Sequence, residues 1–413
     1  MSSEPFAALG RKRIHVTKTS SLGDVFFLLF LSCWRSGQGP GGLTAARERR
    51  GSNMGISSGM GKKAGLAALV LATLLAGCGG NGNGASGGNN GSGNSGTATP
   101  APSGSAGTST SAPVKKVKVV LDWTPNTNHT GLYVARDKGF FLNHGLDVEI
   151  VQPPEGTAAD TLVAKGEAEF GVGYQENITL ARSEGLPLVS LAAVIQHNTS
   201  GFASPEAKGI KEPKAFEGKT YGGWGAPVEQ EVISSLMQEQ GADVGKVKIV
   251  NMGNADFFTA VKRNIDFAWI YYAWTGVEAE LRGEKLNMVY LTDYSKKLDY
   301  YTPVLETSEK LIQESPDVVK AFMAGASEGY AYAISEPDAA ADILIKAVPD
   351  LNPELVRASQ KWLSPKYQDD APRWGEQKAE VWTNYAEWMH EHKLLDTLPD
   401  LSKAFTNDYL PAS

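Results

Sequence analysis

The spacing of apolar side chains predicts alternating strands and helices from residue 117 onward. Residues 146–151 alternate apolar and polar positions, as a strand with one buried face does. Other strands are expected where short apolar runs end near glycines, and helices where apolar residues recur every three or four positions. The expected strands are 117–121, 146–151, 170–173 and 188–195, and the helices are 131–138, 157–165 and one ending near 185. This alternation predicts an α/β lobe with a largely parallel sheet.

A second α/β unit follows, and the chain then returns and becomes helical. We expect strands at 219–222, 247–250 and 266–271, and helices at 227–240 and 255–263. A strand at 301–305 precedes helices at 316–334, 337–347, 353–362 and 374–392, several of which open with proline. The pattern favours two lobes, with 114–200 plus 300–413 in lobe 1 and 201–299 in lobe 2. Hinges are expected near 196–202 and 294–301, and a ligand beyond the carboxyl ends of the strands.

Composition narrows the class of protein. The 413 residues are 42% hydrophobic and 21% charged, which is typical of a soluble globular chain and excludes collagen-like, wholly disordered and polytopic membrane classes. Cys33 and Cys78 are the only cysteines, too few for a disulfide framework or a four-thiolate zinc site. A pI of about 5.5 argues against a nucleic-acid-binding face. We expect no cofactor and no metal.

Residues 54–77 have the organisation of a secretory leader. Two lysines at 62–63 precede an apolar run from Ala64 to Leu75, which is shorter than the roughly 20 residues that span a bilayer. Gly77-Cys78 follows, and the segment resembles a bacterial lipoprotein signal, in which Cys78 becomes the lipidated N-terminus. An ordinary signal peptide with an incidental cysteine is the alternative. Residues 1–53 do not fit this scheme, and we expect them to be a mis-assigned N-terminal extension.

The segment after Cys78 predicts a tether. Residues 79–113 contain eleven glycines and no charged or large apolar side chain. Such a chain buries too little surface to offset its conformational entropy, so we expect it to be disordered. A Gly-rich coil of this length spans about 30–35 Å. Up to residue 77 the chain has ten Lys or Arg against three Asp or Glu, so the expected mature protein is strongly acidic.

Polar and aromatic side chains gather where the predicted strands of lobe 1 end. The loop from Asp122 to His129 contains an acid, an indole, amides and an imidazole. Turn formation and helix capping explain its proline and asparagines, whereas Trp123 and His129 favour ligand contact. Tyr174 and Gln175 follow the strand at 170–173 and are further candidates, although the helix dipole also favours an acidic helix start there.

Lobe 2 contributes a glycine-rich loop and an aromatic strand end. The glycines at 222–225 precede a helix, but no lysine follows, so this is no P-loop, and Glu229 would repel an anion. Trp269 and Tyr271 lie on one face of the strand at 266–271, and some rings of this strand must belong to the core. The loops offer rings, amides and carboxylates but almost no Arg or Lys. They predict a flat, amine-bearing ligand that is neutral or weakly cationic.

Four motifs resemble one family. They are LDWTPNTNHTG at 121–131, GFF at 139–141, YGGWG at 221–225 and DFAWIY at 266–271. Residues 116–410 resemble the thiamine-precursor-binding solute-binding lipoproteins of ABC transporters, the ThiY type, which are related in fold to fungal pyrimidine synthases. The resemblance implies an α/β, two-lobe, periplasmic-binding-protein-like (type II) fold with the ligand cleft between lobes. It implies a formylaminopyrimidine or hydroxymethylpyrimidine ligand, delivered to permease and ATPase subunits for thiamine salvage by a lipid-anchored, extracytoplasmic monomer.

The resemblance also implies roles for individual side chains. Asp122 would orient the first loop, Glu229 would accept a hydrogen bond from the exocyclic amine, and aromatic side chains would stack on the ring. The expected ligand-binding residues are Asp122, Trp123, Asn126, His129, Tyr174, Gln175, Glu229, Trp269 and Tyr271.

Other functions stay open. A pyrimidine-synthase-like enzyme is disfavoured, because those relatives use a cysteine-rich iron motif and the chain after Cys78 has no cysteine. We therefore expect no catalytic residue. Binders of sulfonate, nitrate or bicarbonate share the architecture but need anion donors. A riboflavin-like heterocycle as ligand, or an adhesion or structural lipoprotein, are the remaining alternatives.

Overall fold

The computed structural model describes residues 114–154, 157–253 and 255–412. The expected extension, leader, lipidated Cys78 and tether lie outside the described residues, so they stay predictions. No helix in the described ranges is long and apolar enough to cross a membrane.

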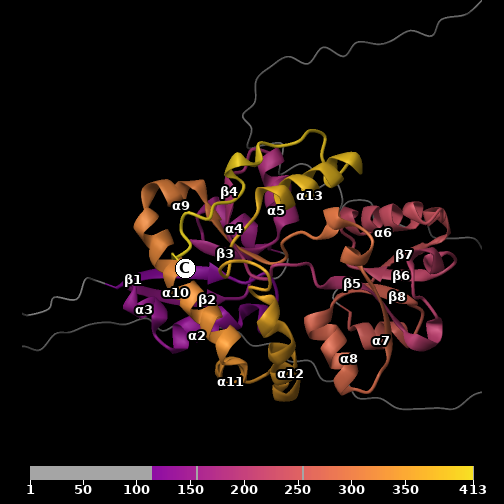
Figure 1. Ribbon diagram of the computed structural model, residues 1–413, viewed down its shortest axis with the longest axis horizontal. Helices are drawn as coiled ribbons and strands as arrows, with labels where there is room; N and C mark the ends of the chain where they lie inside the picture. Colours follow the sequence, from indigo (N-terminus) through magenta and orange to yellow (C-terminus); the bar gives the residue numbers. More distant parts are fainter. Residues whose placement is uncertain (1–113, 155–156, 254, 413) are drawn as a thin grey trace, which may run out of the picture. The chain divides into compact units, whose positions relative to one another are not determined.

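The first sheet has five strands in the order β2-β1-β3-β10-β4 (Figure 1). Its strands are β1 (Lys115–Val120), β2 (Leu146–Val151), β3 (Phe170–Gly173), β4 (Leu188–Ala193) and β10 (Val304–Ser308). Strand β1 pairs in parallel with β2 and β3, whereas β10 is antiparallel to both β3 and β4. Four strands therefore run in one direction, as expected, but the returning strand β10 runs against them and makes the sheet mixed. The expected strand at 301–305 begins three residues later, at Val304.

The second sheet also has five strands, in the order β7-β6-β8-β5-β9. Its strands are β5 (Ser200–Pro205), β6 (Thr220–Gly223), β7 (Lys248–Asn251), β8 (Phe267–Tyr271) and β9 (Leu286–Tyr290). Strand β6 pairs in parallel with β7 and β8, and β5 is antiparallel to β8 and β9. Two mixed sheets with helices around them confirm the α/β fold class.

Strands β5 and β9 were not expected from the sequence. The sequence of β5 is SGFASP, and Ser, Gly and Pro are weak strand formers. The strand exists because it lies between β8 and β9, where its backbone groups are paired on both sides. Gly201 is required there, since a Cβ atom would lie 2.5 Å from the Val289 carbonyl oxygen. Close packing of neighbouring strands thus overrides local propensity.

Twelve α-helices accompany the sheets in the described ranges. They are α2 (Thr130–Asp137), α3 (Phe140–Asn143), α4 (Ala159–Lys165), α5 (Gln175–Ser183), α6 (Pro227–Glu239), α7 (Phe257–Val261), α8 (Val277–Leu281), α9 (Glu309–Glu314), α10 (Pro316–Ser335), α11 (Pro337–Ala347), α12 (Pro353–Leu363) and α13 (Ala379–Glu391). The expected helix at 374–392 begins only at Ala379. Before it, Gly375 forms an isolated antiparallel bridge with Ala193, so that part of the chain extends the first sheet's edge.

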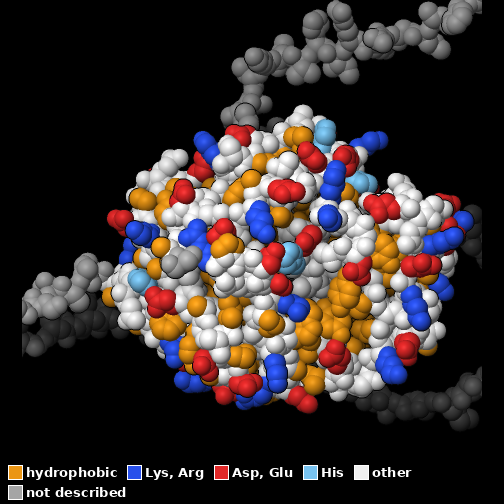
Figure 2. Space-filling model, in the orientation of Figure 1, with side chains coloured by type: hydrophobic (Ala, Val, Ile, Leu, Met, Phe, Trp, Pro, Cys, Tyr) orange, Lys and Arg blue, Asp and Glu red, His pale blue; other side chains and the backbone are white. Residues whose placement is uncertain are grey.

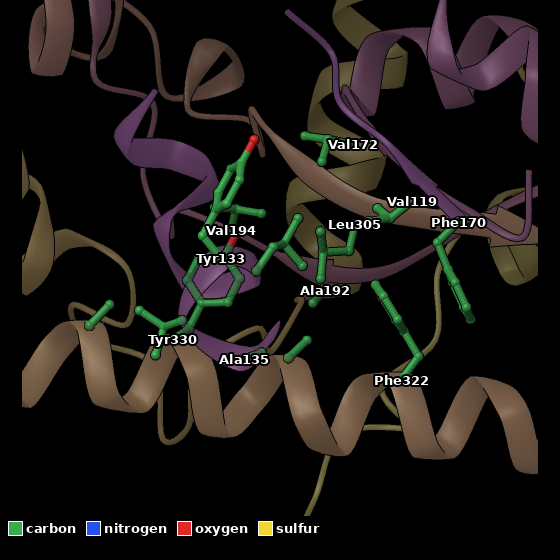
Figure 3. Packing of buried hydrophobic residues seen from close by; sticks show 14 of the residues in the cluster. Val119, Tyr133, Ala135, Phe170, Val172, Ala192, Val194, Leu305, Phe322 and Tyr330 are labelled. Atoms are coloured by element: carbon green, nitrogen blue, oxygen red, sulfur yellow. The ribbon is translucent and has the colours of Figure 1, made fainter. Parts of the chain in front are cut away.

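Helix α10 packs along the first sheet through aromatic side chains (Figure 3). Phe322 stacks on Phe170 of β3, with ring centroids 3.7 Å apart. Farther along the helix, Tyr330 lies against Gly131 of α2, and a Cβ atom on that glycine would come within 2.3 Å of the ring. This packing places the start of α2, and therefore the loop that precedes it, at a defined position over the sheet.

The C-terminal helix α13 joins the two halves of the fold (Figure 1). Trp382 belongs to a buried cluster with residues of the first sheet. Tyr385, Trp388 and Met389 are buried in a different cluster, together with residues of β5 and α6. The Trp388 indole Nε1 also lies 3.3 Å from the Ser235 hydroxyl of α6.

The chain passes between the sheets twice, and the two crossings are bonded to each other. The first runs from β4 to β5 and the second from β9 to β10. The Asn198 amide donates to Asp299 Oδ1 at 2.9 Å, and the Asn198 side chain donates to the Leu298 carbonyl. His197 Nδ1 lies 2.8 Å from Asp299 Oδ2, and its Nε2 lies 3.3 Å from Asp370 Oδ1.

Replacing His197 with asparagine should lower stability in a pH-dependent way. The hydrogen bond to Asp299, with the charges of Asp299 and Asp370, raises the pKa of His197 to about 9 despite partial burial. The contribution of the charged imidazole is therefore complete below about pH 6.5, the unfolded value, and is lost as the pH rises through 9. Thermal unfolding midpoints should differ most between wild type and His197→Asn near pH 6 and converge near pH 9.5. A pH-independent difference would contradict this role.

Candidate ligand-binding site

A cavity of about 920 Å³ opens where strands of both sheets end. Its walls come from the segments that follow β1, β3, β6 and β8. Carboxyl ends of parallel strands are the usual place for a ligand in an α/β fold, because the loops there converge. Met389 and Leu394, from α13 and the turn after it, complete the lining.

Aromatic side chains form much of the cavity wall. Trp123 and Trp224 are about half exposed, at 48% and 43%. Trp224 also contacts the buried ring of Trp269, with centroids 5.4 Å apart. The aromatic residues that line the cavity are Trp123, Tyr174, Trp224, Trp269, Tyr271 and Trp274, apart from two phenylalanines of α7. Exposed indoles at a cavity mouth provide flat apolar faces that a planar ring can cover.

A hydrogen-bonded chain holds the first loop. His129 Nδ1 accepts from the Asn126 amide at 3.1 Å, so Nε2 carries the proton and donates to Asp122 Oδ1 at 2.6 Å. The Tyr174 hydroxyl donates to the other carboxylate oxygen, Oδ2, at 2.7 Å. The loop after β1 is thereby connected to the residue after β3.

The hydrogen bonds from His129 and Tyr174 keep Asp122 ionised. Burial alone would raise the pKa of the Asp122 carboxyl, but the neighbouring His129 and the hydrogen bonds from His129 and Tyr174 outweigh it and lower the pKa. Burial and the Asp122 charge in turn raise the pKa of Tyr174 well above its ordinary value. The tyrosine therefore stays a hydrogen-bond donor, and both Asp122 oxygens are already used within the protein.

The expected role of Glu229 is wrong. Its carboxylate is 2% exposed and does not line the cavity. Oε1 accepts from the amides of Gly225 and Ala226, both at 2.7 Å. Oε2 accepts from the Tyr221 hydroxyl at 2.6 Å and from the Trp224 amide at 3.0 Å. With four donors of its own chain, Glu229 shapes the loop after β6 rather than holding a ligand amine.

Two other expected contacts are also absent from the cavity lining. His129 is fully buried and acts on Asp122, as described above. Gln175 is fully buried as well; its Oε1 accepts from the Tyr301 amide and its Nε2 donates to the Val381 carbonyl. Gln175 therefore connects α5 with the second crossing and with α13. The expected residues that do line the cavity are Asp122, Trp123, Asn126, Tyr174, Trp269 and Tyr271.

Glu176 lines the cavity and was not expected to do so. It lies in the first turn of α5, where the helix dipole alone favours an acidic residue. Because of this explanation, nothing in the sequence suggested Glu176 at the ligand site. Its Oε2 is enclosed and has no hydrogen-bond partner among the described residues. Burial raises the pKa of Glu176 to about 7, against smaller opposing effects of its own backbone amide and the Tyr300 hydroxyl.

The charge of the cavity wall has one sign. Among its described lining residues, Asp122, Glu176, Asp256 and Glu278 are acidic, and none is Lys, Arg or His. Asp256 accepts from Thr259, and Glu278 accepts from Arg282, so these two carboxylates have partners. The outer surface differs, since acidic and basic side chains are interspersed over the face in Figure 2. In the described residues, no cluster of three or more potential metal ligands was found.

Residues 126–340 match the model of the NMT1/THI5-like family. The match covers half of the chain, including every strand of the two sheets except β1. This protein belongs to the NMT1/THI5-like family.

Two relatives of this NMT1/THI5-like protein have different named functions. It is 29% identical over 301 residues to a formylaminopyrimidine-binding protein from Halalkalibacterium halodurans, covering 71% of this chain and 90% of that protein. It is 23% identical to a 4-amino-5-hydroxymethyl-2-methylpyrimidine phosphate synthase from Legionella pneumophila, covering 72% of this chain and 92% of the relative. The relatives of this chain thus include both a binding protein and a synthase.

A solved structure has the same fold. The periplasmic aliphatic sulphonate binding protein SsuA from Escherichia coli superposes with a TM-score of 0.58. It is 14% identical, and the match covers 73% of this chain and 95% of that one. At this identity the likeness shows a periplasmic-binding-protein fold and nothing of the ligand.

Replacing Glu229 with glutamine should destabilise this NMT1/THI5-like fold. The new amide group would face N–H donors where a carboxylate oxygen now accepts, so about 2–4 kcal/mol of unfolding free energy should be lost. Urea denaturation of Glu229→Gln and of Glu239→Gln, an exposed glutamate at the end of the same helix, checks this. Equal stabilities of the two variants would mean that the carboxylate does not hold the loop.

Proposed function

We propose that this protein is the extracytoplasmic solute-binding component of an ABC importer. Its ligand is then a thiamine pyrimidine precursor, formylaminopyrimidine or hydroxymethylpyrimidine, taken up for salvage. The family, the two-sheet fold and the name of the Halalkalibacterium relative support this proposal. Permease and ATPase subunits are the partners that such a function requires.

The acidic cavity wall is the observation that supports this choice of ligand. With four carboxyl-bearing and no basic side chains among its described lining residues, the cavity repels anions and attracts N–H donors. A sulfonate, nitrate or bicarbonate ion would find no basic side chain there to pair with its charge. An aminopyrimidine instead offers an amine to the carboxyl groups and a flat ring to the indoles of Trp123 and Trp224.

Closure of two lobes would complete the site. A cavity of about 920 Å³ exceeds what a single substituted pyrimidine fills. We propose that 114–200 plus 300–413 and 201–299 act as the two lobes and move about the two crossings, so that the half-exposed indoles close on the ring. Asp122 and Glu229 would keep their loops in shape through this motion.

The volume also favours a second candidate. A riboflavin-like heterocycle has a larger planar system and would fill more of the same aromatic cavity without needing a basic residue. It lacks the exocyclic ring amine that the carboxyl groups favour, so the pyrimidine is the first choice.

We propose a binding role without catalysis, although one relative is named a synthase. The chain after Cys78 has no cysteine, in contrast to the cysteine-rich motif expected of a synthase-like relative. A Gly-x-Ser-x-Gly pattern at 325–329 lies in the middle of α10, not at the strand-to-helix turn where such a serine acts as nucleophile.

Calorimetric titration of residues 114–413 with formylaminopyrimidine should show saturable binding at micromolar concentration or tighter. Taurine should not bind, because its sulfonate meets only acidic groups. Trp123→Ala and Trp224→Ala should each raise Kd about two- to tenfold, the value of one aromatic contact at 0.5–1.5 kcal/mol.

Leu142→Ala provides the control, since this exposed side chain is not part of the cavity lining and its loss should leave Kd unchanged. Binding of riboflavin but not of the pyrimidine would select the second candidate. Tight binding of taurine would overturn the choice of ligand class.

We also propose that Cys78 anchors the protein to the membrane through lipid, with residues 79–113 as the tether. In a bacterial host, the full chain should then sediment with membranes, and Cys78→Ser should appear in the soluble extracytoplasmic fraction or stay unprocessed. Equal fractionation of the two proteins would contradict the proposed lipid anchor.

A further inference from the structure

The carboxyl group of Glu176 differs from the other acidic groups of the cavity. Both oxygens of Asp122 accept hydrogen bonds from the protein, and Asp256 and Glu278 have partners as well. Glu176 Oε2 is enclosed at the cavity wall and has no hydrogen-bond partner in the part of the chain that the structure describes. An unsatisfied buried acceptor costs about 1–3 kcal/mol, so a proton or a ligand donor at this group relieves a real penalty.

The groups around Glu176 are phenols rather than cations. Tyr174 precedes it, Tyr271 approaches from β8, Tyr300 from the second crossing and Tyr385 from α13. Burial raises the pKa of each of these phenols, so they stay neutral to at least pH 9. Asp122, the nearest acid on the first loop, stays ionised because its pKa is lowered. Near neutrality Glu176 is therefore the member of this group that changes its charge.

A carboxylic acid and an aminopyrimidine are complementary in a specific way. The protonated acid has one O–H donor beside one carbonyl acceptor. A 4-aminopyrimidine has a ring nitrogen acceptor beside an N–H donor on its exocyclic amine, at the same spacing. The two edges form a pair of parallel hydrogen bonds. The pair contains one shared proton, whether that proton resides on the carboxyl oxygen or on the ring nitrogen.

We propose that Glu176 recognises the amine and ring-nitrogen edge of a 4-aminopyrimidine, and that binding traps one proton between the carboxyl group and the ring. This inference rests on the proposed function. It assigns to Glu176 the contact with the exocyclic amine that the sequence analysis expected of Glu229. No covalent bond changes: the proton comes from solvent when the carboxylate is ionised before binding, and it returns to solvent on release. The indoles then fix the plane of the ring, and Glu176 fixes its orientation within that plane.

Proton uptake predicts a pH dependence. Burial raises the pKa of Glu176 to about 7 in the free protein, so below that value the acid is already protonated and affinity is flat. Above it, each complex must take up a proton, and Kd should rise toward tenfold per pH unit, or about 50-fold between pH 7 and 9.

Substitutions at Glu176 distinguish the effect of its protonation from the effect of its hydrogen bonds. Glutamine presents a carbonyl acceptor and an N–H donor in the same arrangement but does not titrate. Glu176→Gln should therefore keep Kd for formylaminopyrimidine within about threefold at pH 7 and show no change to pH 9. Glu176→Leu, of similar size, should lose at least tenfold at every pH. Glu184→Gln, an exposed glutamate just after the same helix, is the matched control and should keep the wild-type pH profile.

Calorimetry of these four proteins from pH 6 to pH 9, in buffers of different ionisation enthalpy, tests the proposal. Wild type should show the rise in Kd and uptake of close to one proton at pH 8.5, and both should vanish in Glu176→Gln. An analogue with hydrogen in place of the exocyclic amine, which keeps the ring nitrogen but loses the N–H donor, should bind wild type at least tenfold more weakly than formylaminopyrimidine.

The failures are distinguishable. Tight binding of formylaminopyrimidine with a flat pH profile, or a Glu176→Leu variant with unchanged Kd, overturns the role of Glu176 and leaves the proposed function in place. Absence of binding of any aminopyrimidine at pH 6 overturns both.

Discussion

The two passages of the chain between the sheets are the constraint on which the rest of the structure depends. Because β10 returns to the first sheet between β3 and β4, the segment before it runs beside the segment that leaves β4. Asp299 binds the Asn198 amide and the His197 ring across the two passages, and the Val194 amide donates to the Pro303 carbonyl. The strands that end at this place come from both sheets, so their loops face one cavity. The two crossings and the cavity therefore arise from the same topology.

Three carboxyl groups at or near that cavity have separate tasks. Asp122 and Glu229 are surrounded by donors of the protein and hold the loops after β1 and β6. In the described residues Glu176 Oε2 has no hydrogen-bond donor, and burial raises the pKa of Glu176 to about 7. The difference is in the donors within reach. Two side chains, His129 and Tyr174, donate to Asp122, whereas three backbone amides and the Tyr221 hydroxyl donate to Glu229. Among the described residues, none donates to Glu176 Oε2. The two structural carboxylates thus have all their oxygens hydrogen-bonded within the protein, whereas a carboxyl oxygen without a partner is free to accept from a ligand.

The relatives of this chain have names that denote different functions, and the cavity wall is where their side chains would have to differ. An acidic, indole-rich wall without basic side chains in the described lining favours amine-bearing rings, whichever ring is finally bound. The sulphonate-binding structure shares the fold of this chain at 14% identity. Fold and family therefore set the place of the site, and the side chains at the strand ends set its preference.

The sequence by itself determined the α/β alternation, most strand and helix positions and the loops that converge on the cavity, because these depend on local periodicity and on where strands end. It placed six of the nine expected residues at the cavity: Asp122, Trp123, Asn126, Tyr174, Trp269 and Tyr271. Strands β5 and β9 needed the tertiary structure, since a segment such as SGFASP becomes a strand only between two neighbours. The same holds for Met389 and Leu394, which reach the cavity because α13 packs on both halves. The different surroundings of Glu229 and Glu176 were also decided there. Which carboxylate meets backbone amides and which meets an open cavity depends on the direction of the side chain in three dimensions, and residue type and spacing carry no record of that direction.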